Sequence, residues 1–433
     1  MTWPEALRAL RSPNYRLFFL GQSISLMGTW MTRIATAWLV YRLTDSAFLL
    51  GVVGFAGQIP AFFFAPIAGV WIDRWDRHRT LVVTQILSMI QSFALAALAL
   101  TGTIRIWSLI VLVFAQGLIN AFDMPARQSF VIEMVVDRGL LGNAIALNSS
   151  MVNGARLFGP AIGGLVIAAV GEGYCFLIDG ISYIAVIISL LMMHLDRRAA
   201  RGHAKHVLHE LREGWNYILS SDAIRSILFF LALISLIGPY TVLMPIVAGS
   251  ILHGNAHTLG FLMAASGVGA LASAITLALR RTILGLGRMI AISAAIFGAG
   301  LVGLGISRNF WLSMLLMLIT GFGLMQQMAA SNTILQTIVD DEMRGRVMSF
   351  YTVAVLGITP IGSLLSGAFA SRFGAPVTLM TGGACCLAGA AWFARKLPEL
   401  RSMIRPIYRR LGILPEVAAG LETTSAMDVP PER

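Results

Sequence analysis

The chain alternates long apolar runs with short polar connections. Twelve runs approach the roughly 20 residues that a helix needs to cross a hydrocarbon core. They lie at about 16–41, 48–72, 80–101, 106–132, 141–170, 174–195, 225–252, 258–280, 286–306, 310–336, 345–371 and 376–394. Backbone groups in lipid must be satisfied within their own segment, and these runs are too long and too uniformly apolar for barrel strands. The pattern predicts an all-α integral membrane protein with twelve transmembrane helices.

Composition agrees with a membrane protein. Of 433 residues, 57% are hydrophobic and 12% are charged, whereas a soluble domain carries about 25% charged residues. The net charge of +11 would suggest nucleic acid in a soluble chain. Here the basic residues lie between apolar runs, so they indicate orientation, and no nucleic-acid partner is expected. The three cysteines lie in apolar runs and suggest no disulfide framework. We expect no cleaved signal peptide.

Lysine and arginine gather in alternate connections. One set contains most of them: Arg74, Arg77, Arg79, Arg138, Arg197, Arg198, Arg201, Lys205, Arg212, Arg280, Arg281, Arg288, Arg344 and Arg346. The opposite set contains little beyond Arg42, Arg105, Arg308 and Arg372. Because basic loops stay in the cytoplasm, both termini are predicted to be cytoplasmic.

The two halves of the chain repeat in parallel. Leu50-Gly51 and Leu259-Gly260 are offset by 209 residues, and Met124 and Met328 by 204. An offset that drifts so little predicts two six-helix halves related by an axis along the membrane normal, unless glycine-rich helices align by chance. We therefore predict a first half at 1–195, a basic cytoplasmic linker with an amphipathic helix at 196–224, a second half at 225–396, and a cytoplasmic tail, partly disordered, at 397–433.

A short charged turn follows the second apolar run. It reads Gly69-Val70-Trp71-Ile72-Asp73-Arg74-Trp75-Asp76-Arg77-His78-Arg79. Orientation explains the arginines (Arg74, Arg77, Arg79) but neither Asp73 nor Gly69. The spacing resembles the loop 2–3 signature of the major facilitator superfamily, Gly-x-x-x-Asp-Arg/Lys-x-Gly-Arg-Arg/Lys, with Asp76 in place of its glycine. The resemblance implies a cytoplasmic gate motif in which Asp73 latches the two halves, and Arg127 resembles its partner on the fourth helix. In the second half, Thr282 stands at the Asp73 position.

The fifth apolar run contains a dense glycine pattern. Its positions are Gly154, Gly159, Pro160, Gly163 and Gly164. Small residues allow close helix packing, and proline removes a backbone donor and can kink the helix. The Gly-Pro-x-x-Gly-Gly spacing also resembles the helix 5 motif of exporters and antiporters in the same superfamily. The resemblance favours export over import.

Three further stretches resemble one branch of this superfamily. They are 28–33 with 38–44, 121–128 and 343–349, reading GTWMTR with WLVYRLT, AFDMPARQ and MRGRVMS. This branch contains the enterobactin exporter and drug-exporter-like permeases. The resemblance covers about residues 10–396 and implies the major facilitator fold in a bacterial inner membrane. It does not specify the substrate, because the branch is chemically diverse.

Charged residues inside the predicted spans are costly and usually functional. We count five well inside the core, all in the first half: Arg33, Asp123, Arg127, Arg156 and Asp179. A proton-coupled exporter needs a carboxylate that responds to burial and to a nearby cation. Asp123 is preferred, because the resemblance places the fourth helix at the cavity, although Asp123 and Arg127 can equally be a structural pair. Asp179 is the second candidate, with Arg33 or Arg156 as its partner.

Polar side chains concentrate on the first, fourth, seventh and tenth runs. They predict an amphipathic substrate cavity formed by Gln22, Trp30, Arg33, Gln116, Asn120, Tyr240, Gln326, Gln327 and Asn332. For any single amide, a helix–helix hydrogen bond is an equally good explanation. Pro239 and Pro245 flank Tyr240 and suggest a gating helix.

The predicted function is secondary active export of a small amphipathic compound, siderophore-, drug- or lipid-like, by alternating access with proton antiport. Its partners would be the substrate, protons and the lipid bilayer. No nucleotide-binding loop, serine-hydrolase elbow or zinc motif occurs, so we expect no enzyme activity, cofactor or metal. Two alternatives remain open: a lipid or lysophospholipid flippase on the same fold, and a non-transporting membrane receptor or scaffold.

Overall fold

The computed structural model describes residues 5–72, 75–135, 138–193, 207–280 and 282–410, and all regular structure in these ranges is helical. The first half comprises η1 (Glu5–Arg11), α1 (Pro13–Thr44), α2 (Ala47–Ile72), α3 (Arg77–Leu100), α4 (Ile106–Met134), η2 (Arg138–Leu140), α5 (Leu141–Val170) and α6 (Glu172–Leu191). After α7 (Val207–Ser220), the second half comprises α8 (Asp222–Ile237), η3 (Tyr240–Leu243), α9 (Met244–Ile246), η4 (Val247–Ile251), α10 (Ala256–Ala278), α11 (Leu286–Ile306), α12 (Phe310–Ile338), α13 (Asp341–Thr352), η5 (Val353–Gly357), α14 (Thr359–Phe373) and α15 (Ala375–Arg410).

Twelve spans cross the apolar layer, as the sequence predicts. Within the described ranges, 11 are long and apolar enough by themselves. The twelfth is α1, which has 32 residues and packs against α5 and α6. It is more polar than the others because it contains Arg16, Arg33 and Arg42. The twelve-helix integral membrane fold is therefore confirmed.

Two of the spans are broken rather than continuous. The seventh runs through α8, η3, α9 and η4, with Pro239 and Pro245 at the joints. Proline cannot donate the helical hydrogen bond, and π-turns such as η4 absorb such irregularities. The eleventh span has a π-turn at η5, just before Pro360. Both breaks lie in the second half.

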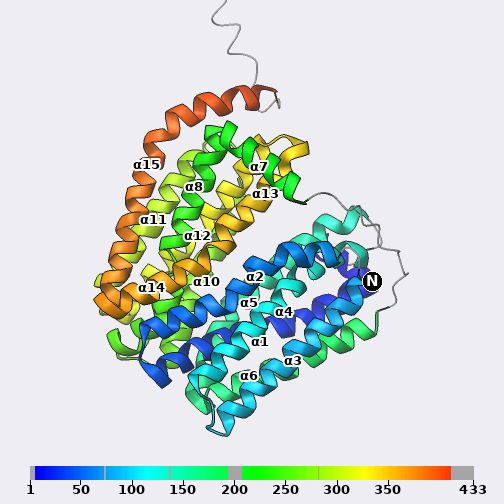
Figure 1. Cartoon of the computed structure of the whole chain (residues 1–433), viewed down its shortest axis with the longest axis vertical. Helices are drawn as coiled ribbons and strands as arrows, with labels where there is room; N and C mark the ends of the chain where they lie inside the picture. Colours follow the sequence, from blue (N-terminus) through cyan, green and yellow to red (C-terminus); the bar gives the residue numbers. More distant parts are fainter. Residues whose placement is uncertain (1–4, 73–74, 136–137, 194–206, 281, 411–433) are drawn as a thin grey trace, which may run out of the picture.

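The two halves form separate helical bundles that meet along two seams (Figure 1). One seam joins α2 to α14, and the other joins α5 to α10. We call the side where α1 begins and α15 ends the terminal face, and the other side the opposite face. Glycines bring the backbones together near the opposite face. A Cβ atom on Gly164 would lie 2.9 Å from the Cα atom of Gly260, and one on Gly51 would lie 2.9 Å from that of Gly367. Such an approach requires residues without a side chain.

Toward the terminal face, the helices on the two sides of each seam lie further apart. On the second seam, Gly267 still lies against Leu157, whose Cα atom would be 3.1 Å from an added Cβ. Nearer the terminal face, a Cβ on Gly154 would meet nothing within 4 Å. Figure 1 shows the same divergence, with the N-terminus at the right and the end of α15 at the top. The halves therefore touch toward the opposite face and separate toward the terminal face.

The helix α7 lies in the predicted linker and is attached to the second half. Tyr217 donates a hydrogen bond of 2.9 Å to Asp340, and Arg346 pairs with Glu213 at 2.7 Å. The rings of Trp215 and Phe350 lie 5.7 Å apart. Through these contacts α7 belongs to the bundle that follows it in the chain.

The last helix is longer than the sequence predicts. The apolar run indicates an end near residue 394, followed by a tail, yet α15 continues to Arg410 through Pro398 and Pro406. Leu397, Leu400 and Tyr408 are buried along this extension. Their burial stabilises helix where composition alone indicates a tail. The rest of the tail predicted at 397–433, residues 411–433, lies outside the described residues, so its predicted partial disorder stays a prediction.

Candidate functional site

A tryptophan and two arginines meet near the middle of the first half. The glycine motif of α5 creates the space, because a Cβ on Gly159 would lie 2.5 Å from the Cβ of Trp30. The guanidinium carbon of Arg33, one turn further along α1, lies 4.7 Å from the Trp30 ring centroid. That of Arg156, one turn before Gly159 on α5, lies 5.9 Å from the same ring. Both distances are typical of cation–π contacts.

These arginines face the space between the halves. The side of α1 that packs on α6 is marked by Gly28, where an added Cβ would lie 2.7 Å from Asp179 Oδ1. Arg33 follows by five residues, about 140° around the helix, and its charge lies close to both Arg156 of α5 and Tyr183 of α6. Arg33 is exposed and Arg156 is half-buried. Among the residues that the structure describes, neither has a hydrogen-bond or ion-pair partner.

The second half completes this site. A Cβ on Gly267 of α10 would lie 3.2 Å from the carbonyl oxygen of Arg156. The neighbouring Ser266 shares a hydrogen bond of 2.7 Å with the Tyr240 hydroxyl, which is buried at the break of the seventh span. We call Trp30, Arg33, Arg156, Tyr240 and Ser266 the central site. It lies where the contact between the halves gives way to their separation.

The glycine motif of α5 has two structural roles. Gly159 and Gly163 face α1, where an added Cβ on Gly163 would lie 3.0 Å from Met31 Cα. Gly164, on the neighbouring side, contacts α10. Pro160 is buried inside a helix that remains continuous. The motif therefore joins the central site to the seam between the halves, while Gly154 marks the point where the seam opens.

Comparison with known proteins identifies the chain. The profile of a family described as transmembrane secretion effector matches residues 5–425. The chain belongs to this family of major facilitator transporters. It is therefore a multi-pass membrane protein and not an enzyme.

Relatives of this transporter include named exporters. The staphyloferrin A transporter of Staphylococcus aureus is 26% identical over 83% of this chain and 90% of its own length. The multidrug efflux pump Tap of Mycobacterium tuberculosis is 26% identical over 91% and 95%. Macrolide efflux protein A of Streptococcus pyogenes is 22% identical over 83% and 91%.

Solved structures share the fold at low identity. The nucleoside transporter NupG has a TM-score of 0.69 at 12% identity and covers 89% of this chain and 98% of its own. A bacterial homologue of the iron transporter ferroportin, in an inward-facing state, has a TM-score of 0.67 at 15% identity and covers 88% and 98%. These likenesses support the two-bundle fold.

Asp123 of the transporter is enclosed between α3 and α4. It pairs with Arg127 and accepts hydrogen bonds from Thr84 Oγ1 at 2.9 Å and Gln85 Nε2 at 2.7 Å. Its side chain is buried. Arg127 thus balances the charge of this carboxylate, and all its hydrogen bonds are made within the first half. The side chain points toward α3 rather than toward the second half.

Asp179 has a different environment. It is buried on α6, where its Oδ2 accepts a hydrogen bond of 3.0 Å from Ser92. Thr32 lies close to its other oxygen, but Oδ1 and the Thr32 hydroxyl both lack a hydrogen bond of good geometry. Within the described part of the chain, Asp179 pairs with neither Arg33 nor Arg156. The pairing considered from the sequence is therefore not formed in this conformation.

The repeat between the two halves relates the position of Asp123 on α4 to a position on α12. At the offset that relates Met124 to Met328, Asp123 corresponds to Gln327 and Arg127 to Ser331. Both are fully buried, and the Gln327 amide and Ser331 hydroxyl have no hydrogen-bond partner among the described residues. The second half thus keeps polar groups at these positions without the charges.

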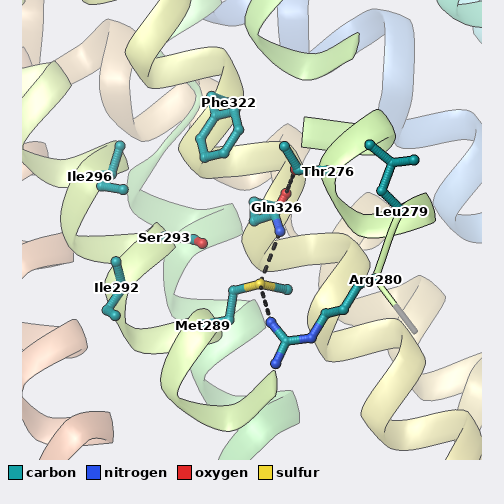
Figure 2. Close-up of a pocket in the computed structure, with 9 residues that line it drawn as sticks. All are labelled: Thr276, Leu279, Arg280, Met289, Ile292, Ser293, Ile296, Phe322 and Gln326. Atoms are coloured by element: carbon teal, nitrogen blue, oxygen red, sulfur yellow. Dashed lines mark hydrogen bonds between the residues drawn. The ribbon is translucent and has the colours of Figure 1, made fainter. Parts of the chain in front are cut away.

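The remaining predicted cavity residues lie outside the central site. Gln116 donates to Ser88 of α3 at 3.1 Å and to Asn120 at 3.3 Å. Gln326 accepts from Ser273 and Thr276 of α10 and lines a pocket of about 470 Å³ between α10, α11 and α12 (Figure 2). The other three are Gln22, which is buried, Gln327, and Asn332, which accepts from Gln336. Of the predicted cavity set, only Trp30, Arg33 and Tyr240 belong to the central site.

The predicted gate motif is described in part. Asp73 and Arg74 lie outside the described residues, so the proposed latch of Asp73 with Arg127 is not observed, and Gly69 is seen only as part of α2. Arg77 pairs with Glu133 at the end of α4. Asp76, which replaces the glycine of the family pattern, caps α3 by accepting from the backbone N–H of Arg79 at 3.2 Å. The departure from the pattern therefore has a local structural role.

Several partners are not predicted from the sequence. Thr84 and Gln85 supply donors to Asp123, Glu133 pairs with Arg77, and Ser266 bonds to Tyr240. Each is a polar residue within or at the end of an apolar run, and this position is the sequence signal that could have identified it as a hydrogen-bond or ion-pair partner. Their pairing depends on how neighbouring helices are rotated.

Proposed function

We propose that this transporter exports a small amphipathic compound across the bacterial inner membrane by alternating access, driven by proton antiport. The family and the relatives named as efflux proteins support export. The distribution of lysine and arginine supports cytoplasmic termini, which would make the terminal face cytoplasmic. The conformation described above would then be inward-facing.

The position of the central site carries this proposal. Its residues come from both halves and lie at the inner end of the region where the halves separate. On the opposite face, the glycine seams close the passage, and the Tyr41 hydroxyl of α1 bonds to Ser250 of η4 at 2.8 Å. A site reached from one face and sealed from the other is the arrangement that alternating access requires.

The α5 motif also favours export. Gly163 and Gly164 place α5 against α1 on one side and against α10 on the other. A helix packed in this way couples movement of the central site to opening of the seam. This coupling gives a structural reason why the motif resembles that of exporters.

The contacts favour Asp179 over Asp123 as the proton carrier. Three donors, one of them charged, stabilise the carboxylate of Asp123. Asp179 is buried, has no cationic partner among the described residues and lies against α1 behind Arg33. Protonation removes the cost of burying a carboxylate charge that no cation balances. Asp123 stays the second candidate, and Asp73 stays the proposed cytoplasmic latch.

Transport in proteoliposomes tests the proposal. Purified protein with an imposed pH gradient should move compounds from a panel of amphipathic drugs and siderophores. Asp179→Asn should abolish the response to the gradient while leaving substrate exchange intact, and Asp123→Asn should keep the response. Asp73→Asn should slow transport without loss of folded protein.

Three outcomes would contradict parts of this scheme. Movement of labelled lysophospholipid alone, independent of pH, would indicate a flippase. Absence of transport for every compound, with none of the aspartates affecting any readout, would indicate a receptor or scaffold. A normal gradient response in Asp179→Asn would exclude it as the carrier.

A further inference from the structure

We propose that the central site recognises the carboxylate of an anionic amphipathic substrate, with Arg33 and Arg156 binding the anion and Trp30 packing against its apolar body. This inference rests on the proposed export function and adds the charge class of the exported compound.

The charge balance of the site is the first reason. Two other arginines of the first half are matched by acids, Arg127 by Asp123 and Arg42 by Glu172. Arg33 and Arg156 have no acidic partner in the part of the chain that the structure describes, and their charges repel each other. Unpaired charges at this depth are costly. A bound anion would neutralise both.

The nearby acid cannot supply this charge. Asp179 packs against Gly28 of α1, five residues before Arg33, and among the described residues it forms no ion pair with Arg33 or Arg156. The hydroxyl groups near the site, on Tyr240 and Ser266, bond to each other and are uncharged. None of these side chains therefore balances the positive charges of Arg33 and Arg156.

The geometry of the groups selects the ligand class. Guanidinium groups present a planar fork of donors that matches a carboxylate, and such charge-assisted bonds are strong. The guanidinium groups of Arg33 and Arg156 both lie at the indole ring of Trp30. This ring offers an apolar surface against which an aromatic group can pack. A ligand with a carboxylate next to an apolar or aromatic body satisfies both features. A cation would be repelled.

Matched probes test the charge class. The full-length protein in nanodiscs of neutral phosphatidylcholine is titrated calorimetrically with 1-naphthoate and with its uncharged counterpart 1-naphthamide. The wild type should bind 1-naphthoate at least about tenfold more tightly, and added salt should weaken this preference. Arg33→Gln and Arg156→Gln should each weaken 1-naphthoate binding at least about tenfold. Arg372→Gln, an exposed arginine on the opposite face, is the matched control and should bind as the wild type does.

Equal binding of the two probes, no binding of 1-naphthoate, or unchanged binding in both glutamine variants would overturn the proposal. Size-exclusion profiles confirm folding. Arg33→Lys and Arg156→Lys keep the charge but lose the planar guanidinium, so they should bind 1-naphthoate with intermediate affinity.

Export in proteoliposomes separates this inference from the proposed function. If neutral or cationic drugs are exported but 1-naphthoate is not preferred, the anion site is wrong and export stands. If arginine-dependent 1-naphthoate binding occurs but no compound is moved, the site stands and export is wrong.

Discussion

Replacing Gly164 by alanine is expected to shift the transporter away from the conformation in which its halves touch at the opposite face. The added Cβ would lie 2.7 Å from the carbonyl oxygen of Ala256 and 2.9 Å from the Cα of Gly260. Both are backbone atoms, so no side chain can rotate to make room. Overpacking of this kind costs about 1–3 kcal/mol. Because the proposed alternating access requires this seam to open in the alternative state, the equilibrium should shift by roughly five- to 150-fold toward that state.

Spin labels on exposed positions of both faces measure this shift. One pair, at Arg105 and Arg308, reports on the opposite face, and another, at Arg79 and Thr282, reports on the terminal face. In Gly164→Ala, double electron–electron resonance should show longer distances for the first pair and shorter distances for the second.

The same helix provides the control. Gly154→Ala adds an identical methyl group where nothing lies within 4 Å, and alanine favours helix by about 0.5–1 kcal/mol over glycine. Its distance distributions should match the wild type. If Gly164→Ala also matched the wild type, the glycine seam would not determine which face is closed.

Two further substitutions test the buried polar groups by their effect on Tm in detergent. Asp123→Ala leaves Arg127 without its partner and should destabilise the protein by about 3 kcal/mol, the lower end for buried pairs, because Arg127 retains 23% side-chain exposure. Asp341→Ala, which breaks an exposed pair with Arg344, should cost less than about 1 kcal/mol, and equal losses would contradict the assignment. Gln327→Leu removes buried, unpartnered amide atoms and should stabilise by about 1–3 kcal/mol; a lower Tm would show that the amide is satisfied.

Much of the fold can be predicted from the sequence, because a membrane helix satisfies its own backbone. Length and apolar composition of the helices suffice for 11 of the twelve spans, α1 being more polar. The predicted second run, 48–72, differs from α2 by one residue at its start. The end of α15 could not be predicted in this way. Pro398 and Pro406 indicate a break, and only tertiary burial of residues such as Leu400 explains why the helix continues.

The site could be predicted less completely. The pairing of Asp123 with Arg127 follows from their four-residue spacing on one helix. The pairing of Asp123 with Thr84 and Gln85 depends on the rotation of α3, which an apolar run does not record. For the same reason, Arg33 and Arg156 can be selected as unusual charges, but their meeting at Trp30 requires the packing of α1 on α5.

The uneven distribution of charge between the halves would make movement of the first half sensitive to the membrane potential. Three arginines and two aspartates lie inside the spans of the first half, a formal excess of one positive charge. In the second half, α10 and α12 contain no Asp, Glu, Lys or Arg. A membrane potential acts with about 2.3 kcal/mol per elementary charge per 100 mV for a complete crossing. A rocking movement that displaced the charges of the first half relative to the membrane would therefore respond to voltage even when no ion is carried.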